Sequence, residues 1–233
     1  MLTLVFAESA LETIPKQLWA HPTIQKYVKL RQKHPRFIIL NRSYHHSAMK
    51  MLTQSEKRGR PDILHFAMLV ALGSPLNKER LLTVYVHTVN DEMIYVASET
   101  RLPRNCNRFT NLMEQGFEFR RIPPKQPDKP LLIFKQQTLT QLMREIQPSF
   151  TLALSRKGRP ETFEEAISKL AGEKKPVVFV GGFPKGHFSE ATLKLADDVV
   201  RIDMEMLETW TVTSRVTYEF ERALSLPRKR LED

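Results

Sequence analysis

Short apolar segments alternate with helical segments in the C-terminal part of the sequence, and this alternation constrains the fold more than any other feature. The apolar segments have the length of strands, and the segments between them have the length and polar faces of helices. This order is typical of a parallel sheet with helices on both faces. The predicted strands span 150–154, 177–182 and 198–202, and the predicted helices span 138–146, 161–171, 189–196 and 210–224.

The N-terminal part contains one clear hairpin. Residues 81–89 and 92–98 are rich in β-branched and aromatic residues, and the turn-forming pair Asn90-Asp91 lies between them. Residues 120–130 are rich in proline and predict a loop or linker between two halves. Further predictions are strands at 2–6 and 37–40, helices after Pro15, at 46–52, 61–72 and 107–115, and a break at 74–77.

Composition limits the class of protein. The 233 residues include 36 Lys and Arg against 26 Asp and Glu, and the net charge of +10 favours a polyanionic partner or a basic surface that aids solubility. No apolar run approaches the roughly 20 residues that span a bilayer, and the N-terminus lacks a secretory signal. The single cysteine, Cys106, excludes an internal disulfide and a multi-cysteine zinc site, fits a reducing cytoplasm, and is predicted to be a bystander. His45 and His46 lack metal-ligand spacing, so a structural role is predicted for both.

Three loops follow the predicted C-terminal strands at their carboxyl ends, where open parallel sheets bind ligands. The loops span 155–159, 181–186 and 203–208. Gly181, Gly182 and Gly186 permit close approach to a ligand or to another segment, or serve only a tight turn. The spacing matches neither a dinucleotide fingerprint nor a nucleotide-hydrolase phosphate loop, and no serine hydrolase motif is present.

Arginines cluster in two segments. Arg58 and Arg60 stand beside Asp62 at the start of the predicted helix over 61–72, where a carboxylate suits the positive end of the helix dipole. Arginine binds phosphates through a planar fork, so the two clusters predict a polyanion groove; a solvated charged face is the alternative. The second cluster has steps of three and four residues, which share a helix face, although Pro103 restricts the helix to part of the run. It consists of Arg101, Arg104 and Arg108.

Several of these segments resemble one protein family. They are RSYHHSAMK (42–50), EKRGRPDILH (56–65), SPLN (74–77), VHTVND (86–91), RLPRNCNRFTNLMEQ (101–115), VGGFPKGHF (180–188) and LETWTVTSRVTYEFE (207–221). Nearly the whole chain, in order, is similar to the Nep/Emg family of SPOUT-class methyltransferases, which are specific for pseudouridine N1 in small-subunit ribosomal RNA. The short N-terminus resembles archaeal members. Two departures are the acidic third loop, IDMEMLE, and Asn41, which stands where relatives have an acidic residue.

The resemblance implies an α/β fold with a SPOUT-type parallel sheet, helices on both faces and a C-terminal trefoil knot. It implies a single domain over 1–233, with an RNA-binding hairpin and loop insertion near 75–130 and a knotted cofactor-binding part over 150–224. The cofactor implied is S-adenosyl-L-methionine, with S-adenosyl-L-homocysteine as product and no metal. Trp210 would either flank the cofactor or only pack the last helix. The cofactor residues implied are Leu154, Ser155, Gly181, Gly186, Ile202, Asp203, Met204, Glu205, Met206 and Leu207.

The same resemblance implies a cytoplasmic homodimer that binds small-subunit rRNA and, beyond it, ribosomal or assembly proteins, but no membrane. Asp62 would hold Arg60 in position, with the role of general base as the weaker alternative, and Arg58 would contact phosphate or only add to the local field. The implied function is methylation of pseudouridine N1 in the biogenesis of the small subunit. An assembly factor in which methyl transfer is dispensable, and a SPOUT enzyme acting on transfer RNA, are the alternatives. The RNA contacts implied by the family are Arg60, Arg101, Arg104 and Arg108.

Overall fold

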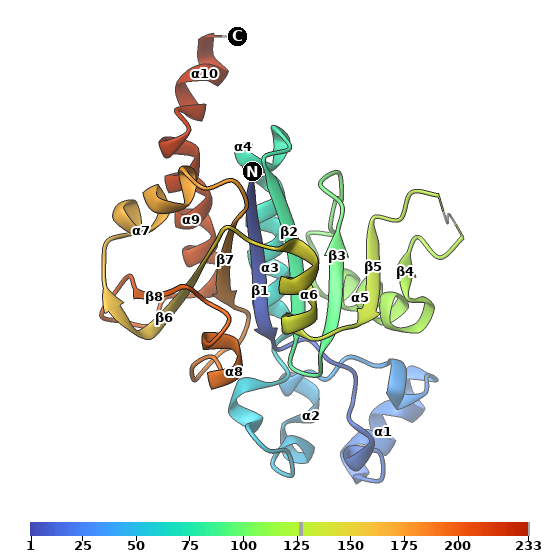
Figure 1. Cartoon of the computed structure of the whole chain (residues 1–233). Helices are drawn as coiled ribbons and strands as arrows, with labels where there is room; N and C mark the ends of the chain where they lie inside the picture. The colour runs from blue at the N-terminus through green and yellow to red at the C-terminus, as the bar shows by residue number, and fades with distance from the viewer. Residues whose placement is uncertain (126–127, 233) are drawn as a thin grey trace.

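The computed structural model describes residues 1–125 and 128–232 and contains one eight-stranded sheet (Figure 1). The strand order is β4-β5-β3-β2-β1-β7-β6-β8, so β1 lies inside the sheet between strands from the two parts of the chain. The strands are β1 (Leu2–Ser9), β2 (Leu82–Thr88), β3 (Glu92–Val96), β4 (Arg121–Ile122), β5 (Leu132–Gln136), β6 (Phe150–Pro160), β7 (Pro176–Gly181) and β8 (Asp198–Arg201).

The predicted parallel sheet is confirmed for five neighbouring strands. Strands β2, β1, β7, β6 and β8 pair in parallel, whereas β3, β5 and β4 add antiparallel strands at the other edge. The predicted hairpin forms β2 and β3 and extends the same sheet. Because β1 pairs with both β2 and β7, the segment over 120–130 does not separate two bodies; residues 126–127 of that segment lie outside the described residues.

Helices cover both faces, as predicted, because alternate side chains of the strands point to opposite sides. Leu4 and Phe6 of β1 pack with α3, α5, α7 and α9, whereas Val5 and Ala7 pack with α6. Within the described residues, no helix has the length and apolar character to span a membrane. The helices are α1 (Pro22–Arg31), α2 (Arg42–Met49), α3 (Pro61–Gly73), α4 (Pro75–Lys78), α5 (Cys106–Phe119), α6 (Leu139–Ile146), α7 (Phe163–Ala171), α8 (Glu190–Leu193), α9 (Thr209–Ala223) and α10 (Leu226–Glu232), with 3-10 turns at Lys16–Leu18, Pro35–Phe37 and Ser55–Lys57.

Helices α1 and α2 form a small unit below the sheet in Figure 1, with a hydrophobic core of its own. The strand predicted at 37–40 is wrong, because this run ends a 3-10 turn and joins no sheet. Ile39 makes only an isolated bridge to Thr13, while Ile38 and Leu40 are buried in the small core. The apolar run therefore reflects burial and not strand pairing.

Several other boundaries differ from the predictions. The loop predicted at 155–159 is assigned to β6, but the pairing with β8 shifts register between Leu154 and Arg159, so the intervening residues bulge out of the ladder. Residues 74–77, predicted as a break, begin the short helix α4 with Ser74 as N-cap. The prediction also missed β5, in which Leu132 and Phe134 are buried and alternate with more exposed residues.

Candidate cofactor cavity and arginine-rich face

A cavity lies at the carboxyl ends of β6, β7 and β8 and encloses about 670 Å³ of empty space, its open mouth included. All three predicted loops contribute to its wall. Met204 is the exception among the predicted cofactor residues, since its side chain is 84% exposed and does not line the cavity. The lining includes Leu154, Ser155, Gly181, Gly186, Ile202, Asp203, Glu205, Met206 and Leu207.

The glycines of the second loop have different roles. A Cβ atom on Gly182 would lie 2.2 Å from Ser9 Oγ, so this glycine permits close packing against the end of β1. Gly186 has φ +96°, in the region that favours glycine, and a Cβ there would meet nothing within 4 Å. Gly181 is fixed by a hydrogen bond, because Thr209 Oγ1 at the start of α9 donates to its carbonyl oxygen at 2.8 Å. Close approach to another segment and turn geometry therefore both occur in this loop.

The cavity combines apolar walls with charged groups at its rim. Val180 and Phe188 are buried beside it, and the third loop contributes the acidic side chains of Asp203 and Glu205. Several residues that line the cavity were not among the predicted site residues. One of them, Arg201, lies at the end of a predicted strand and beside a predicted loop. Because open parallel sheets bind ligands at the carboxyl ends of their strands, this position was the signal that could have identified these residues. The missed lining residues are Arg156, Val180, Phe183, His187, Phe188, Arg201, Thr209 and Val212.

Glu8 at the end of β1 is a buried carboxylate that sequence reasoning did not single out. Its backbone has φ 52°, which is uncommon for a residue with a side chain. It forms an ion pair with Lys57 and accepts hydrogen bonds from Ser189 N and Oγ, both at 2.8 Å, and from Thr192 Oγ1 at 2.6 Å. Burial raises the pKa of Glu8, but the hydrogen bonds from Lys57, Thr192 and Ser189 outweigh this and hold the pKa below its ordinary value.

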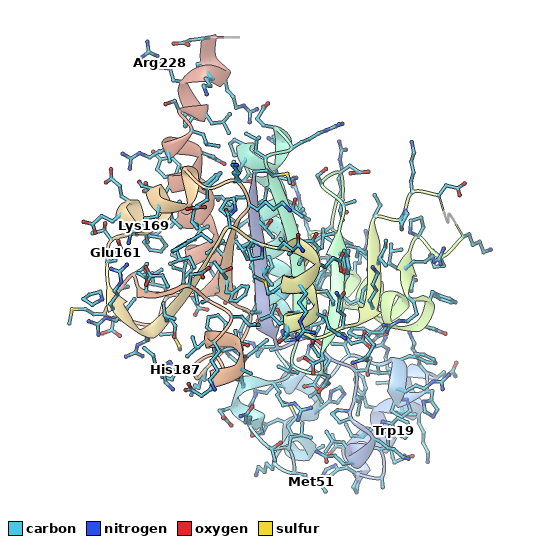
Figure 2. All side chains as sticks on the ribbon, in the orientation of Figure 1. Trp19, Met51, Glu161, Lys169, His187 and Arg228 are labelled. Carbon is cyan, nitrogen blue, oxygen red and sulfur yellow. The ribbon has the colours of Figure 1, made fainter. Side chains whose placement is uncertain are left out.

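Lys57 connects this carboxylate to the cofactor loop. Its Nζ atom donates to the carbonyl oxygen of His187 at 2.7 Å and lies 4.0 Å from the centroid of the Phe183 ring. His187, labelled in Figure 2, lies beside α8. Phe183 and His187 both line the cavity, and Lys57 directly precedes Arg58. Lys57 therefore links the cavity wall to the first arginine cluster.

The predicted pairing of Arg60 with Asp62 is confirmed. Arg60 Nε donates to Asp62 Oδ1 at 2.9 Å, and Arg60 Nη2 donates to Asp62 Oδ2 at 2.7 Å. The hydrogen bond from Arg60 to Asp62 raises the pKa of the guanidinium, and the charges of Asp62 and Glu208 add to the effect. Since Glu208 follows the cavity residue Leu207, the pair lies near the cavity rim.

Arg58 does not face solvent with Arg60. Its Nε and Nη2 atoms donate to the two oxygens of buried Glu12 at 2.7 and 2.5 Å, and its side chain is only 13% exposed. The hydrogen bonds that Arg58 donates to Glu12 raise the pKa of this guanidinium. A guanidinium occupied in this way has little capacity left for phosphate, so the predicted phosphate contact of Arg58 is unsupported and its role is structural.

The second arginine cluster is exposed, but it does not form one helical face. Helix α5 begins at Cys106 with Asn105 as N-cap, so Arg108 is helical whereas Arg101 and Arg104 precede the helix. Because the helix begins only after Pro103 and the N-cap Asn105, Arg104 and Arg108 do not share a helix face. In the part of the chain that the structure describes, these three arginines make no ion pair, and their side chains are open to a ligand.

Cys106, His45 and Trp210 lie in surroundings that fit structural roles. Burial raises the pKa of the Cys106 thiol, and the nearby charge of Asp62 adds to it, so the unreactive thiol form is favoured. His45 is buried, with Nδ1 accepting from the Asn41 backbone at 3.0 Å. Trp210 packs edge-on against Phe66 at 5.5 Å and does not line the cavity, which supports the packing role. Among residues 1–125 and 128–232, no three His, Cys, Asp or Glu side chains gather in a metal-binding arrangement.

Comparison with known proteins identifies the family. The model of the EMG1/NEP1 methyltransferase family matches residues 4–221. The chain is 44% identical over 220 residues to the ribosomal RNA small subunit methyltransferase Nep1 of Pyrococcus furiosus, with 94% of this chain and 96% of that protein covered. It is 42% identical to the Nep1 protein of Thermococcus kodakarensis, with 97% of this chain and all of that protein covered.

A solved structure agrees with these sequence relationships. The crystal structure of Archaeoglobus fulgidus Nep1 bound to S-adenosylhomocysteine superposes with a TM-score of 0.83 at 41% identity, covering 96% of this chain and 98% of the other. The match therefore extends over the sheet, the cavity and the arginine-bearing segments. With this fold, these motifs and a family model that spans nearly all of its length, the chain belongs to the EMG1/NEP1 methyltransferase family.

Proposed function

We propose that this protein uses S-adenosylmethionine to methylate N1 of a pseudouridine in small-subunit ribosomal RNA, during biogenesis of that subunit. The observation that supports this most is the cavity at the carboxyl ends of β6, β7 and β8, in a fold shared with a Nep1 protein bound to S-adenosylhomocysteine. The relatives named as rRNA small subunit methyltransferases support the substrate class.

The residues of the cavity fit the cofactor. Its apolar walls suit an adenine ring and a thioether, and Asp203 and Glu205 suit a cationic ligand. When bound, S-adenosylmethionine supplies a methyl group made electrophilic by a positively charged sulfur. We assign its binding to Leu154, Ser155, Gly181, Gly186, Ile202, Asp203, Glu205, Met206 and Leu207, with exposed Met204 left out.

The arginine-rich face is the proposed site for RNA. Arg101, Arg104 and Arg108 are exposed beside α3, the helix that begins directly after Arg60, since His65 Nε2 of α3 lies 2.6 Å from the carbonyl oxygen of Pro103. The three arginines would bind phosphates around a base turned out of its stack. The bidentate contact with Asp62 fixes the direction of the Arg60 guanidinium, so it is aimed before RNA arrives. Holding the nitrogen and the methyl group in line lowers the barrier, by about 7–11 kcal/mol in well-oriented systems.

Asp62 acts in this proposal as a positioning residue. Both of its carboxylate oxygens accept hydrogen bonds from Arg60, so it is poorly placed to take up another proton. The proton that pseudouridine N1 loses when its bond to carbon forms passes to water in this scheme. An Asp62→Asn variant is therefore expected to weaken RNA binding through a loosened Arg60, and saturating RNA should restore most of the rate.

The chain is proposed to function in the cytoplasm as a homodimer. Each copy is proposed to form one domain, in which the segment over 75–130 binds RNA and the part over 150–224 holds the cofactor in a trefoil knot.

The face shared by α3 and α9 is the candidate dimer surface, because Phe66 and Tyr218 are 45% and 54% exposed beside a groove between α3, α9 and α10. The occupant we propose is a second copy of this chain. Sedimentation velocity should give a dimer for wild type and a monomer for Tyr218→Glu; a monomeric wild type would contradict the proposal.

Labelled-methyl transfer tests the reaction. Purified protein with S-adenosylmethionine labelled in its methyl group is expected to modify a small-subunit rRNA hairpin that contains pseudouridine, and not the same hairpin with uridine. Equal labelling of the two hairpins would contradict the N1 specificity, because uridine has no free N1. Labelling of transfer RNA in preference to both hairpins would favour a transfer-RNA enzyme.

A second candidate function is an rRNA-binding assembly factor, with ribosomal or assembly proteins as further partners, in which methyl transfer is dispensable. The exposed arginines favour it as much as they favour the enzyme. Calorimetry separates the two functions: tight binding of the hairpin without measurable binding of S-adenosylmethionine would support the assembly factor. Binding of both ligands supports the enzyme.

The arginines should act through phosphate contacts. Arg104→Ala is expected to weaken hairpin binding and to reduce the slope of log affinity against log salt by about one, because one phosphate contact is lost. Lys174→Ala removes an exposed cation after α7 and is the matched control. An unchanged salt slope for Arg104→Ala, or an equal change for the control, would contradict the assignment.

A further inference from the structure

A second cavity, separate from the cofactor cavity, opens between α1, α2 and α5. Its empty space is about 650 Å³, including the open mouth, and it shares no lining residue with the first cavity. We call it the tyrosine–asparagine pocket, after five of the residues that line it. These are Tyr27, Asn41, Tyr44, Asn107 and Asn111.

The pocket adjoins both arginine-bearing segments. Asn107 directly precedes Arg108 near the start of α5, so one side of the pocket continues the second arginine cluster. On the other side, Arg42 N donates to the carbonyl oxygen of Gly59 at 2.8 Å, which joins the start of α2 to the residue before Arg60. A strand of RNA whose phosphates contact the arginines would therefore pass the mouth of this pocket.

The buried carboxylate at the floor of the pocket is paired and not free. Glu114 is buried, with its side chain 2% exposed, and accepts hydrogen bonds from Arg31 at 2.8 Å and from Lys33 at 3.4 Å. Glu114 also accepts a hydrogen bond from the backbone N–H of Ile39 at 3.2 Å, and Lys33 pairs in addition with Glu118 at 3.5 Å. Glu114 therefore presents no uncompensated negative charge to a ligand in the pocket.

Tyrosine supplies a flat platform at the mouth. The rings of Tyr27 and Tyr44 are stacked, with centroids 5.3 Å apart and planes 26° from parallel. Tyr27 is held from two other sides, because His45 meets its ring edge-on at 4.7 Å and Arg31 donates to its hydroxyl at 3.2 Å. Tyr44 remains 49% exposed, so one side of a ring that is already in place is open for stacking.

Amide groups surround this platform. Arg31 donates to Asn111 Oδ1 at 3.2 Å, and Asn41 Oδ1 accepts from Ser43 N at 2.9 Å, so both amides are oriented by their oxygens. Over the two described ranges, no other hydrogen bond is made by these side chains, and each keeps an NH2 group for a ligand. Oriented amides beside an aromatic ring are the groups with which proteins read the edge of an unstacked base.

We propose that the tyrosine–asparagine pocket binds a second unpaired base of the RNA substrate, on a nucleotide close to the methylated one, with Tyr44 stacking on the base and the asparagines reading its edge. This inference rests on the proposed function, since it takes RNA as the substrate. It adds a source of sequence selectivity outside the cofactor cavity. Phosphate contacts alone do not distinguish sequences.

The test uses the hairpin that the wild-type protein methylates, with each unpaired nucleotide in turn replaced by an abasic site. Besides the target, one abasic position is expected to weaken wild-type binding by about 5- to 150-fold, the range for loss of one stacked base. Tyr44→Ala should bind the intact hairpin as weakly as wild type binds that abasic hairpin, with no further loss when both changes are combined. Asn107→Ala should reduce the preference between bases at the same position.

Two variants serve as controls. Tyr44→Phe keeps the ring and is expected to bind like wild type, and Phe119→Ala removes a ring that is 50% exposed at the far end of α5 and should leave binding unchanged. If Tyr44→Ala keeps the same affinity and the same abasic profile as wild type while methylation proceeds, the pocket does not bind a base and this inference is overturned. If wild type methylates no pseudouridine hairpin, the proposed function itself is overturned.

Discussion

Replacing Lys57 by methionine tests the buried link between the cofactor loop and the arginine-bearing segment. Methionine keeps the length of the side chain but removes the charge that faces Glu8 and the donor to the carbonyl oxygen of His187. The Lys57 and Glu8 side chains are 10% and 11% exposed, so solvent screens their interaction weakly. The variant therefore leaves a carboxylate buried without its counter-ion.

The structure sets the size of the effect. Removing one partner of a buried ion pair destabilises a protein by about 3–5 kcal/mol. Glu8 retains its donors from Ser189 and Thr192, so we expect the lower end, about 3 kcal/mol of unfolding free energy. Since Lys57 also holds two residues of the cavity wall, the variant should bind S-adenosylhomocysteine more weakly.

Urea denaturation at pH 7 measures the loss of unfolding free energy. Glu8→Gln/Lys57→Met, which removes both charges, should recover most of it, because replacing a whole buried pair is often close to neutral. Lys185→Met is the matched control, since Lys185 is exposed on the same loop. The folded state lowers the pKa of Glu8, so the pair stabilises fully above the ordinary pKa of 4.5, and its contribution disappears as the pH falls below that value.

Two results would refute this reasoning. A loss below about 1 kcal/mol for Lys57→Met would mean that the pair behaves like an exposed one. A double variant no more stable than Lys57→Met would mean that lost packing, and not an uncompensated charge, causes the effect.

Two further predictions concern packing and pH. Gly182→Ala should destabilise the protein by about 1–3 kcal/mol in thermal or urea unfolding, because the added Cβ would clash with Ser9. Gly172→Ala is the control and should not destabilise it, because a Cβ there meets nothing within 4 Å. Equal effects of the two variants would contradict the close approach of Gly182 to Ser9. Burial, with the charge of Arg31, lowers the pKa of His45 from 6.5 to about 4, so folding favours the neutral ring. Unfolding free energy should fall by about 3 kcal/mol from pH 6.5 to pH 4, and His45→Gln should remove this dependence; an unchanged slope would contradict it.

Local pattern was enough to predict the parallel sheet and the loops at its carboxyl ends. The strands of the C-terminal part are short apolar runs separated by helices, and topology then brings their ends to one edge. The cavity residues Ser155, Gly181 and Leu207 were predicted for this reason together with the family resemblance. The pairing of Arg60 with Asp62 was predictable because the two residues are only two positions apart.

Contacts between distant residues were beyond such patterns. Arg58 is neutralised by Glu12, which is 46 positions away, so its charge appeared available in the sequence when it is not. The ion pair of Glu8 with Lys57 spans 49 positions and depends on the fold in the same way. The strand wrongly predicted at 37–40 shows the converse, since hydrophobicity reports burial whether or not a strand partner exists.

The central claim is that the ends of β6, β7 and β8 hold the methyl donor beside a face that binds RNA. A crystal structure of this protein with S-adenosylhomocysteine tests it most directly. The account predicts the ligand in the cavity between Ser155, Gly181 and Leu207, with its sulfur toward the side on which Arg60 lies. Density for the ligand at another site, or a cavity left empty at saturating ligand, would contradict it.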